Sequence, residues 1–457
     1  MPCFSLIAVV FAALPLDADT GAMAIRLSVQ PMAAPKPVLK VQLLPEMREL
    51  NVGNPAHEYD RCFAEQRNFF FSKEAVADRG RYLSMPLGEL PVQKLRDYGR
   101  LALSRADWAA RLNHLDWQLL QQTQTHATEV TQPEVGRLAV LAEALRVRFR
   151  VEIASGRFDD AIGTAKTMFA LARHLGEYPT QAGNLIGLAV AHLCMDSLEE
   201  MVQQPGCPNF YWALTDLPIP LVEVRKGVRG DCASVAADLR LLREDAPMDG
   251  EHLEQFLQQL SGLLGFARAQ KGLPPRNLRS ALAARVQDSE LVRAARARLV
   301  EAGYAEKSVK QFPPLQAILL ADKRDYEVHR DESLKLLALA PWQIDAFADT
   351  EGLHCGDGVF APYSPRVIEV RRAQGRLEQR IGLLQHIEAL RLYAAAHAGE
   401  LPTELSELSV PLVLDPFTGK PFRYNVEAGT AYLSGRPPRG EEQNPCFHLH
   451  YALTLRK

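Results

Sequence analysis

The sequence lacks the short motifs that mark the commonest catalytic and cofactor sites. Its 457 residues contain no Gly-x-x-x-x-Gly-Lys phosphate loop, no strand-linked Gly-x-Gly-x-x-Gly, no Gly-x-Ser-x-Gly elbow and no Cys-x-x-Cys pair. Each motif supplies a specific geometry, respectively for phosphate, a dinucleotide, a serine nucleophile and a metal or redox centre. Sequence alone therefore indicates no catalytic residue and no cofactor.

A strong charge of either sign is also missing. The formal net charge is −3, with 23% charged and 47% hydrophobic residues. A general nucleic-acid binder needs a concentrated basic surface to neutralise phosphates, so we expect no nucleic-acid partner. The basic run at residues 293–298 has alanines between its arginines and is typical of a solvated helix face.

Long hydrophobic runs are absent beyond the N-terminus, so we expect no transmembrane segment in the mature chain. Residues 4–16 are apolar but too short to span a bilayer comfortably, and Ala22-Met23-Ala24 is a small-x-small site. These features favour a signal peptide over residues 1–24 and a periplasmic or secreted protein. The usual basic residues before the apolar run are missing, and the alternative is a buried N-terminal segment.

Cysteine is sparse and irregularly spaced. Of seven cysteines, Cys3 would leave with the signal peptide, and the other six do not form the pattern of a small disulfide scaffold. Cys355 and Cys446 lie in Gly- or Pro-containing loops and are a possible disulfide. Cys194 and Cys232 lie on apolar helix faces and are expected to be buried thiols.

Helical periodicity dominates what is present. Leu138, Leu141 and Leu145 begin an apolar face over residues 136–204, which contains three expected helices. The string Gly156-x-Phe158-x-x-Ala161 resembles the inter-helix turn of a tetratricopeptide repeat, although no second clean copy follows. We expect a mainly α protein, an irregular α-solenoid or helical bundle. It would comprise an N-terminal irregular helical region (25–135), a repeat-like helical domain (136–350) and a small α+β tail (351–457).

An aromatic loop interrupts the helices at residues 205–220, where proline and glycine forbid a long helix. Phe210, Tyr211 and Trp212 either fill a space between helices or form an interaction loop that binds a ligand or partner. The string Asn-x-Tyr-Trp-Ala-Leu, followed by Leu-Pro-x-Pro, resembles secreted helical bacterial proteins that carry no known activity.

The tail has the most recognisable plan. An amphipathic helix at 377–397 precedes a Gly-Glu-Leu-Pro turn, a short helical segment, Asp415-Pro-Phe-Thr-Gly and a hairpin around Ala428-Gly429. This order resembles the soluble half of type II secretion pseudopilins. The resemblance implies one long helix packed on an antiparallel sheet of about three strands. Arg371 and Arg372 precede the helix where pseudopilins have a membrane segment, so pilus assembly is not implied.

A metal site is a weaker possibility. His448 and His450 alternate on an expected strand, next to Cys446 and after the loop that holds His354 and Cys355. Imidazole and thiolate ligands can form a tetrahedral zinc site, although a surface histidine strand with a disulfide explains the same residues. Glu199 and Glu200 end a helix and are expected to be exposed.

From these patterns we expect a non-catalytic secreted or periplasmic scaffold that acts through protein–protein contacts with other envelope proteins. The alternatives are a metal-dependent hydrolase, or a small-ligand-binding module, at the junction of the helices and the tail.

Overall fold

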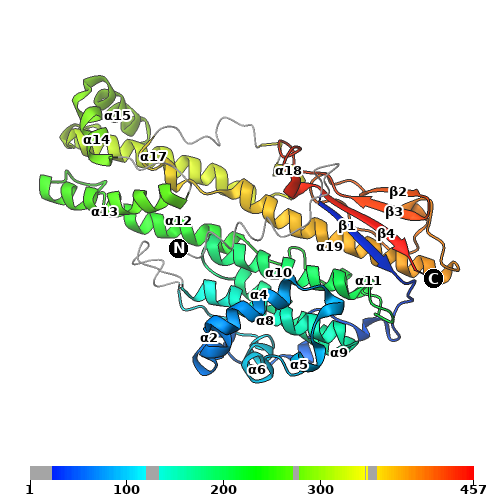
Figure 1. Ribbon diagram of the computed structural model, residues 1–457. Coiled ribbons are helices and arrows are strands. Elements are labelled where there is room, and N and C mark those ends of the chain that lie inside the picture. Colours follow the sequence, from blue (N-terminus) through cyan, green and yellow to red (C-terminus); the bar gives the residue numbers. More distant parts are fainter. Residues whose placement is uncertain (1–22, 120–132, 271–276, 345, 348–357, 457) are drawn as a thin grey trace.

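The computed structural model describes residues 23–119, 133–270, 277–344, 346–347 and 358–456. Within these residues the chain is mainly helical, with one small sheet at the end of the molecule opposite a projecting set of helices (Figure 1). The first twenty-two residues, which make up most of the expected signal peptide, lie outside the described residues, whereas its last two residues, Met23 and Ala24, begin a strand.

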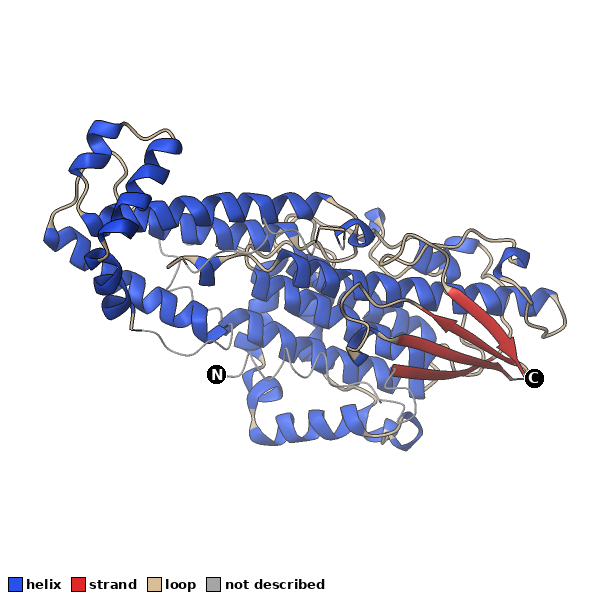
Figure 2. Cartoon of the chain, turned by 90° about the horizontal axis from the view of Figure 1, so that it is seen from above, coloured by secondary structure: helices blue, strands red, loops and turns tan. Residues whose placement is uncertain are grey.

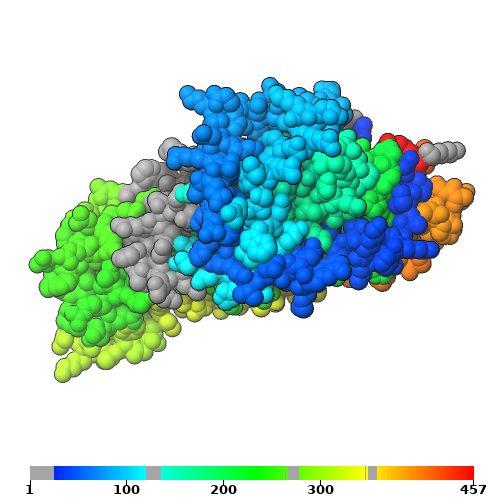
Figure 3. Space-filling model, turned by 90° about the horizontal axis from the view of Figure 1, so that it is seen from below, coloured from blue at the N-terminus to red at the C-terminus, as the bar shows by residue number. Residues whose placement is uncertain are grey.

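The N-terminal helices are short and lie against the longer helices that follow them. They are α2 (Pro55–Glu65), α3 (Arg67–Phe71), α4 (Lys73–Ser84), α5 (Val92–Leu95) and α6 (Arg100–Ala109). Figure 3 shows these N-terminal helices, blue to cyan, spread across the lower surface of the molecule.

Short 3-10 helices occur along the whole chain. They are η1 (Val38–Lys40), η2 (Met47–Glu49), η3 (Leu87–Glu89), η4 (Lys335–Ala338), η6 (Ala361–Tyr363), η7 (Leu405–Glu407) and η8 (Pro445–Phe447).

Three long helices follow: α8 (Pro133–Ala154), α9 (Phe158–Gly176) and α10 (Gln181–Met201). The turn between α8 and α9 contains Gly156, whose φ of +68° favours glycine. Leu141, Leu145 and Phe149 are fully buried in the main core, as the apolar periodicity predicts. After these helices comes α11 (Tyr211–Thr215).

A helical arm then projects from the body. We use this term for the described residues of 239–334, which form most of a second apolar cluster that Val359 and Phe360 complete. The helix α12 (Arg225–Leu239) leads into the arm, which contains α13 (Gly250–Gln270), α14 (Leu278–Gln287), α15 (Ser289–Glu301), α16 (Glu306–Gln311) and α17 (Pro314–Leu334). Figure 2 shows the arm and the strands at opposite ends of the molecule.

The C-terminal region contains α18 (Pro341–Ile344), the long helix α19 (Val367–Ala396), β2 (Arg423–Glu427), β3 (Thr430–Ser434) and β4 (Leu449–Leu455). The expected antiparallel sheet of about three strands is instead a mixed sheet of four, in the order β1-β4-β3-β2. The additional strand β1 (Met23–Val29) spans the end of the expected signal peptide and the start of the region expected to be irregular and helical, and it pairs in parallel with β4. Leu27 and Val29 of β1 are buried in the main core, so pairing at this edge also covers apolar surface.

Glycines allow the loops of the tail to approach α19 closely. A Cβ on Gly375 would lie 2.7 Å from the ring of Phe417, and one on Gly382 would lie 3.0 Å from Val413. These two glycines are seven residues apart and share a helix face. They therefore place the Asp415 turn directly against the helix that carries the buried charges described below.

Candidate functional site

The helix α19 buries charged side chains as well as its apolar stripe. Leu384, Ile387 and Leu390 are fully buried, as expected. Arg380, Arg391 and other polar side chains of the same helix are buried too. Burying a charge is unfavourable unless it is paired and hydrogen-bonded, so the partners of these groups are central to any function.

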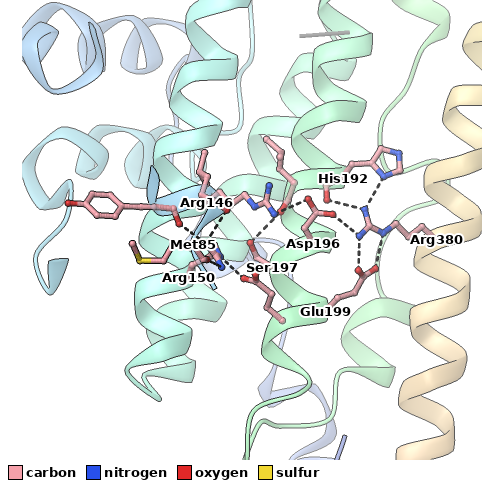
Figure 4. Close-up of polar contacts among 12 residues, drawn as sticks. Met85, Arg146, Arg150, His192, Asp196, Ser197, Glu199 and Arg380 are labelled. Carbon is pink, nitrogen blue, oxygen red and sulfur yellow. Dashed lines mark hydrogen bonds and ion pairs between the residues drawn. The ribbon is translucent and has the colours of Figure 1, made fainter. Parts of the chain in front are cut away.

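Arg380 is the centre of the largest cluster. Its Nε donates to Glu199 Oε1 at 2.8 Å, and its Nη2 donates to Glu199 Oε2 and Asp196 Oδ1, both at 2.7 Å. The second oxygen of Asp196 lies 3.1 Å from Arg146 Nη2, and Tyr451 donates its hydroxyl to Glu199. We call these five residues the Arg380 cluster. It joins α8, α10, α19 and β4, as Figure 4 shows for its helical members.

Burial and charge act on the ionisable groups of this cluster in different directions. Burial opposes the positive charge of Arg380, but Glu199 and Asp196 raise its pKa well above the ordinary value. Burial raises the pKa of Tyr451, and Glu199 adds to the effect. Nearby His192 has a pKa held well below its ordinary value, first by burial and then by Arg376 and Arg380. The cluster therefore holds charged arginine and carboxylate pairs beside a neutral imidazole and a neutral phenol.

A second buried pair fixes the aromatic loop to the same helix. Arg391 Nη1 lies 2.8 Å from Glu388 Oε1, and Arg391 also donates to the carbonyl oxygens of Cys207 and Gln30. Glu388 accepts a 2.7 Å hydrogen bond from the backbone N–H of Phe210. One helix thus holds both the loop before α11 and the end of β1.

The chemistry available to these groups is limited because they are engaged with one another. Both carboxylates of the Arg380 cluster accept bonds from arginine, and Arg380 itself is only 1% exposed. A general base needs a free lone pair within reach of a substrate proton, and a metal site needs several converging ligands. Among the described residues, no group of three or more His, Cys, Asp or Glu side chains could hold a metal ion. The arrangement is suited to holding helices together.

Of the five candidate metal ligands, two lie outside the described residues and three lie at or before β4. His354 and Cys355 lie outside the described residues, so the possible Cys355–Cys446 disulfide does too. His448 immediately precedes β4 and its Nε2 lies 2.6 Å from the carbonyl oxygen of Glu442. His450 lies on β4 with its ring 5.7 Å from that of Tyr432. Cys446 is half-buried near Arg376.

The aromatic loop is largely enclosed by its own chain. Phe210 and Tyr211 are fully buried, and the Tyr211 hydroxyl donates to the carbonyl oxygen of Pro411. Asn209 donates to the carbonyl oxygen of Glu388 at 2.9 Å. Trp212 is the partly exposed member of the three and contacts the edge of Tyr211. This geometry uses two of the three rings for packing between α11 and α19, and leaves Trp212 as the one ring of the three that is partly accessible.

The Asp-Pro turn of the tail is closed by N–H donors. Asp415 is buried; its Oδ1 accepts from Gln379 Nε2 and from the Phe417 N–H, both at 3.0 Å. Its Oδ2 accepts from the Arg436 N–H at 2.8 Å. A calcium ligand would need these lone pairs, so hydrogen bonding occupies the positions that a cation would require.

Sequence reasoning missed the Arg380 cluster. It expected Glu199 to be exposed, but that expectation is wrong because Glu199 is buried between α10, α19 and β4. The only advance signal was a spacing: Asp196 and Glu199 lie three residues apart, and Arg376 and Arg380 lie four apart, so the members of each pair share a helix face. Spacing shows that these groups face one way, but it does not show that two oppositely charged faces meet.

Comparison with known proteins adds no relative. The chain gives no match to a family model, to a curated protein or to a solved structure. In addition, no helix in the described parts of the chain combines the length and hydrophobicity needed to cross a bilayer. Function must therefore be argued from the geometry.

Proposed function

We propose that this protein is a non-catalytic scaffold of the periplasm or the extracellular space that acts through contacts with other envelope proteins. The observation that carries the proposal is the engagement of two fully buried arginines, Arg380 and Arg391, with neighbouring carboxylates. Arg380, Glu199 and Asp196 satisfy one another, as do Arg391 and Glu388. Groups used in this way stabilise a shape but do not perform acid–base chemistry.

The architecture supports the same reading. The α8–α9–α10 helices form a repeat-like hairpin array in the proposal, and the combination of α19 with its sheet serves as a pilin-like tail. The arm extends away from this body over a separate apolar cluster, to which Val359 and Phe360 also contribute. Exposed apolar side chains on the arm, at Leu241, Leu291 and Val300, offer contact points for a partner.

A capture experiment tests the proposal. The full chain is immobilised and exposed to an envelope fraction, and captured proteins are compared with those held by a Leu241→Glu/Leu291→Glu variant. We expect a defined envelope protein that the unmodified chain binds and the variant loses, with unchanged melting of the two baits. A chain that captures nothing specific but turns over a small molecule would refute the scaffold.

The alternative of a metal-dependent hydrolase makes a different prediction. Stoichiometric zinc in the purified protein, lost on His448→Ala, would favour a metal site at the helix–tail junction. For the ligand-binding alternative the test is Trp212→Ala, because Trp212 is the accessible ring of the aromatic loop. Ligand binding that survives this change would exclude the loop as the site.

A further inference from the structure

The strand β2 forms an open edge of the sheet. It is the last strand in the order β1-β4-β3-β2, and Figure 1 shows it at the outer border of the sheet. The opposite edge differs, because the N–H of Ser28 on β1 bonds the side chain of Gln203 and the carbonyl oxygen of Ser28 accepts from Arg456. An edge without such partners presents a row of hydrogen-bonding groups to another chain.

The turn between β2 and β3 determines which backbone groups point outward. Ala428 and Gly429 form a two-residue connection, both with positive φ, so Glu427 and Thr430 are a hydrogen-bonded pair. Pairs alternate along the hairpin, and the N–H and C=O groups of Tyr424 and Val426 therefore face away from β3. Within the described chain these outward groups have no backbone partner.

The charged side chains of β2 complement those of a second β2 strand that runs antiparallel to it. Arg423, Asn425 and Glu427 are exposed on one face of the strand, while Tyr424 and Val426 are half-buried on the other. The positive charge stands two residues before Asn425 and the negative charge two residues after it. In an antiparallel pair centred on Asn425, each Arg423 therefore lies opposite the Glu427 of the other strand.

The same register satisfies the backbone. Centring the pair on Asn425 places Tyr424 of one strand opposite Val426 of the other, and these are the two residues whose N–H and C=O groups point outward. Such a pair exchanges both backbone hydrogen bonds. The side-chain charges and the outward backbone N–H and C=O groups are thus both satisfied by the same antiparallel register.

From this agreement we propose that two copies of this chain associate through antiparallel pairing of their β2 strands about a two-fold axis at Asn425. The product is one continuous eight-stranded sheet, with Arg423–Glu427 ion pairs on its outer face. A two-fold interface uses the same patch on both subunits, and a strand whose charges complement its own reversed sequence fits that requirement. The interface is small, so the association is weak and concentration-dependent. It does not depend on the scaffold proposal.

Charge exchange tests the register directly. Sedimentation velocity over a concentration series should show the unmodified full chain shifting from monomer to dimer. Arg423→Glu alone and Glu427→Arg alone each place like charges opposite one another twice, and we expect each to weaken association on the order of tenfold or more. The double variant Arg423→Glu/Glu427→Arg, and an equimolar mixture of the two single variants, should recover dimer.

Two further variants complete the test. Val426→Pro removes an outward N–H without removing a β2–β3 hydrogen bond, and it should abolish the dimer. Arg293→Glu changes an exposed charge on α15 of the arm and should leave association unchanged. Circular dichroism confirms that each variant is folded.

The opposing outcomes are equally definite. An unmodified chain that stays monomeric at every concentration would overturn the proposal, and so would a dimer that tolerates all of the β2 variants. Single variants that dissociate without rescue by the double variant or the mixture would refute the proposed register.

Discussion

The body around α19 and the helical arm use charge in different ways. In the body, Arg380 and Arg391 are buried and paired with carboxylates that are buried as well. In the arm, Asp322 and Lys323 are buried beside Arg285 and Glu244, but other pairs such as Arg298–Asp325 are about half exposed. Exposed ion pairs contribute little to stability, whereas breaking a buried pair leaves an uncompensated charge. The comparison indicates that fully buried arginines join the helices of the body, whereas the arginines of the arm's ion pairs keep part of their surface in solvent.

Removal of a buried arginine should have the largest effect. Arg380→Met leaves Glu199 and part of Asp196 unpaired, and we expect a loss of about 3–5 kcal/mol in the free energy of unfolding. The matched change in the arm is Arg298→Met, for which we expect less than about 1 kcal/mol. Chemical denaturation of both variants measures the difference, and equal effects would remove the distinction between the regions.

Replacing a glycine by alanine should lower the stability of the body but raise the stability of the arm. Gly375→Ala places a methyl group against the ring of Phe417 and should destabilise the body by about 1–3 kcal/mol. Gly262 lies within α13 with nothing within 4 Å of an added Cβ. Gly262→Ala should therefore stabilise the arm by about 0.5–1 kcal/mol. Melting temperatures distinguish the two, and a stabilising Gly375→Ala would show that the turn does not lie against the helix.

Removing a single tyrosine hydroxyl should lower the free energy of unfolding by a smaller amount, and the loss should be larger in the body than in the arm. Tyr451→Phe removes a hydrogen bond to buried Glu199 and should cost about 1.5 kcal/mol. Tyr304 of the arm donates to Glu244 at an exposed position. Tyr304→Phe should cost less than about 0.5 kcal/mol by the same denaturation assay. Equal losses for the two variants would mean that water can replace the Tyr451 hydroxyl at Glu199, which would contradict the burial of that carboxylate.

Acidification should weaken the body gradually. Burial lowers the pKa of His386 to about 4, from 6.5 in the unfolded chain. The unfolded state therefore binds a proton first, and stability present above pH 6.5 is lost as the pH falls toward 4. We expect a loss of about 1 kcal/mol from this residue by about pH 5.8. His386→Phe should reduce the slope of stability against pH in this window, and an unchanged slope would contradict the buried neutral imidazole.

Sequence patterns predicted the parts of this fold that depend on neighbours along the chain. The α19 stripe, the buried face of α8 and the β2–β3 hairpin follow from helical spacing, strand alternation and the Ala428-Gly429 turn. The parallel pairing of β1 with β4 joins opposite ends of the chain, and no local signal specifies it. The Arg380 cluster was missed for a related reason, since a charged residue on an amphipathic helix is usually exposed. Pairing between two charged faces depends on how the helices pack in space.

Hydrogen exchange of the unmodified protein tests the central comparison most directly. Our account predicts that the backbone amides of α19 around Arg380 and those of α10 around Glu199 exchange slowest and together, because the Arg380 cluster joins the two helices. The amides of α14 and α15 in the arm should exchange faster. Protection of the arm equal to or greater than that of α19 and α10 would contradict the claim that buried ion pairs hold the body together.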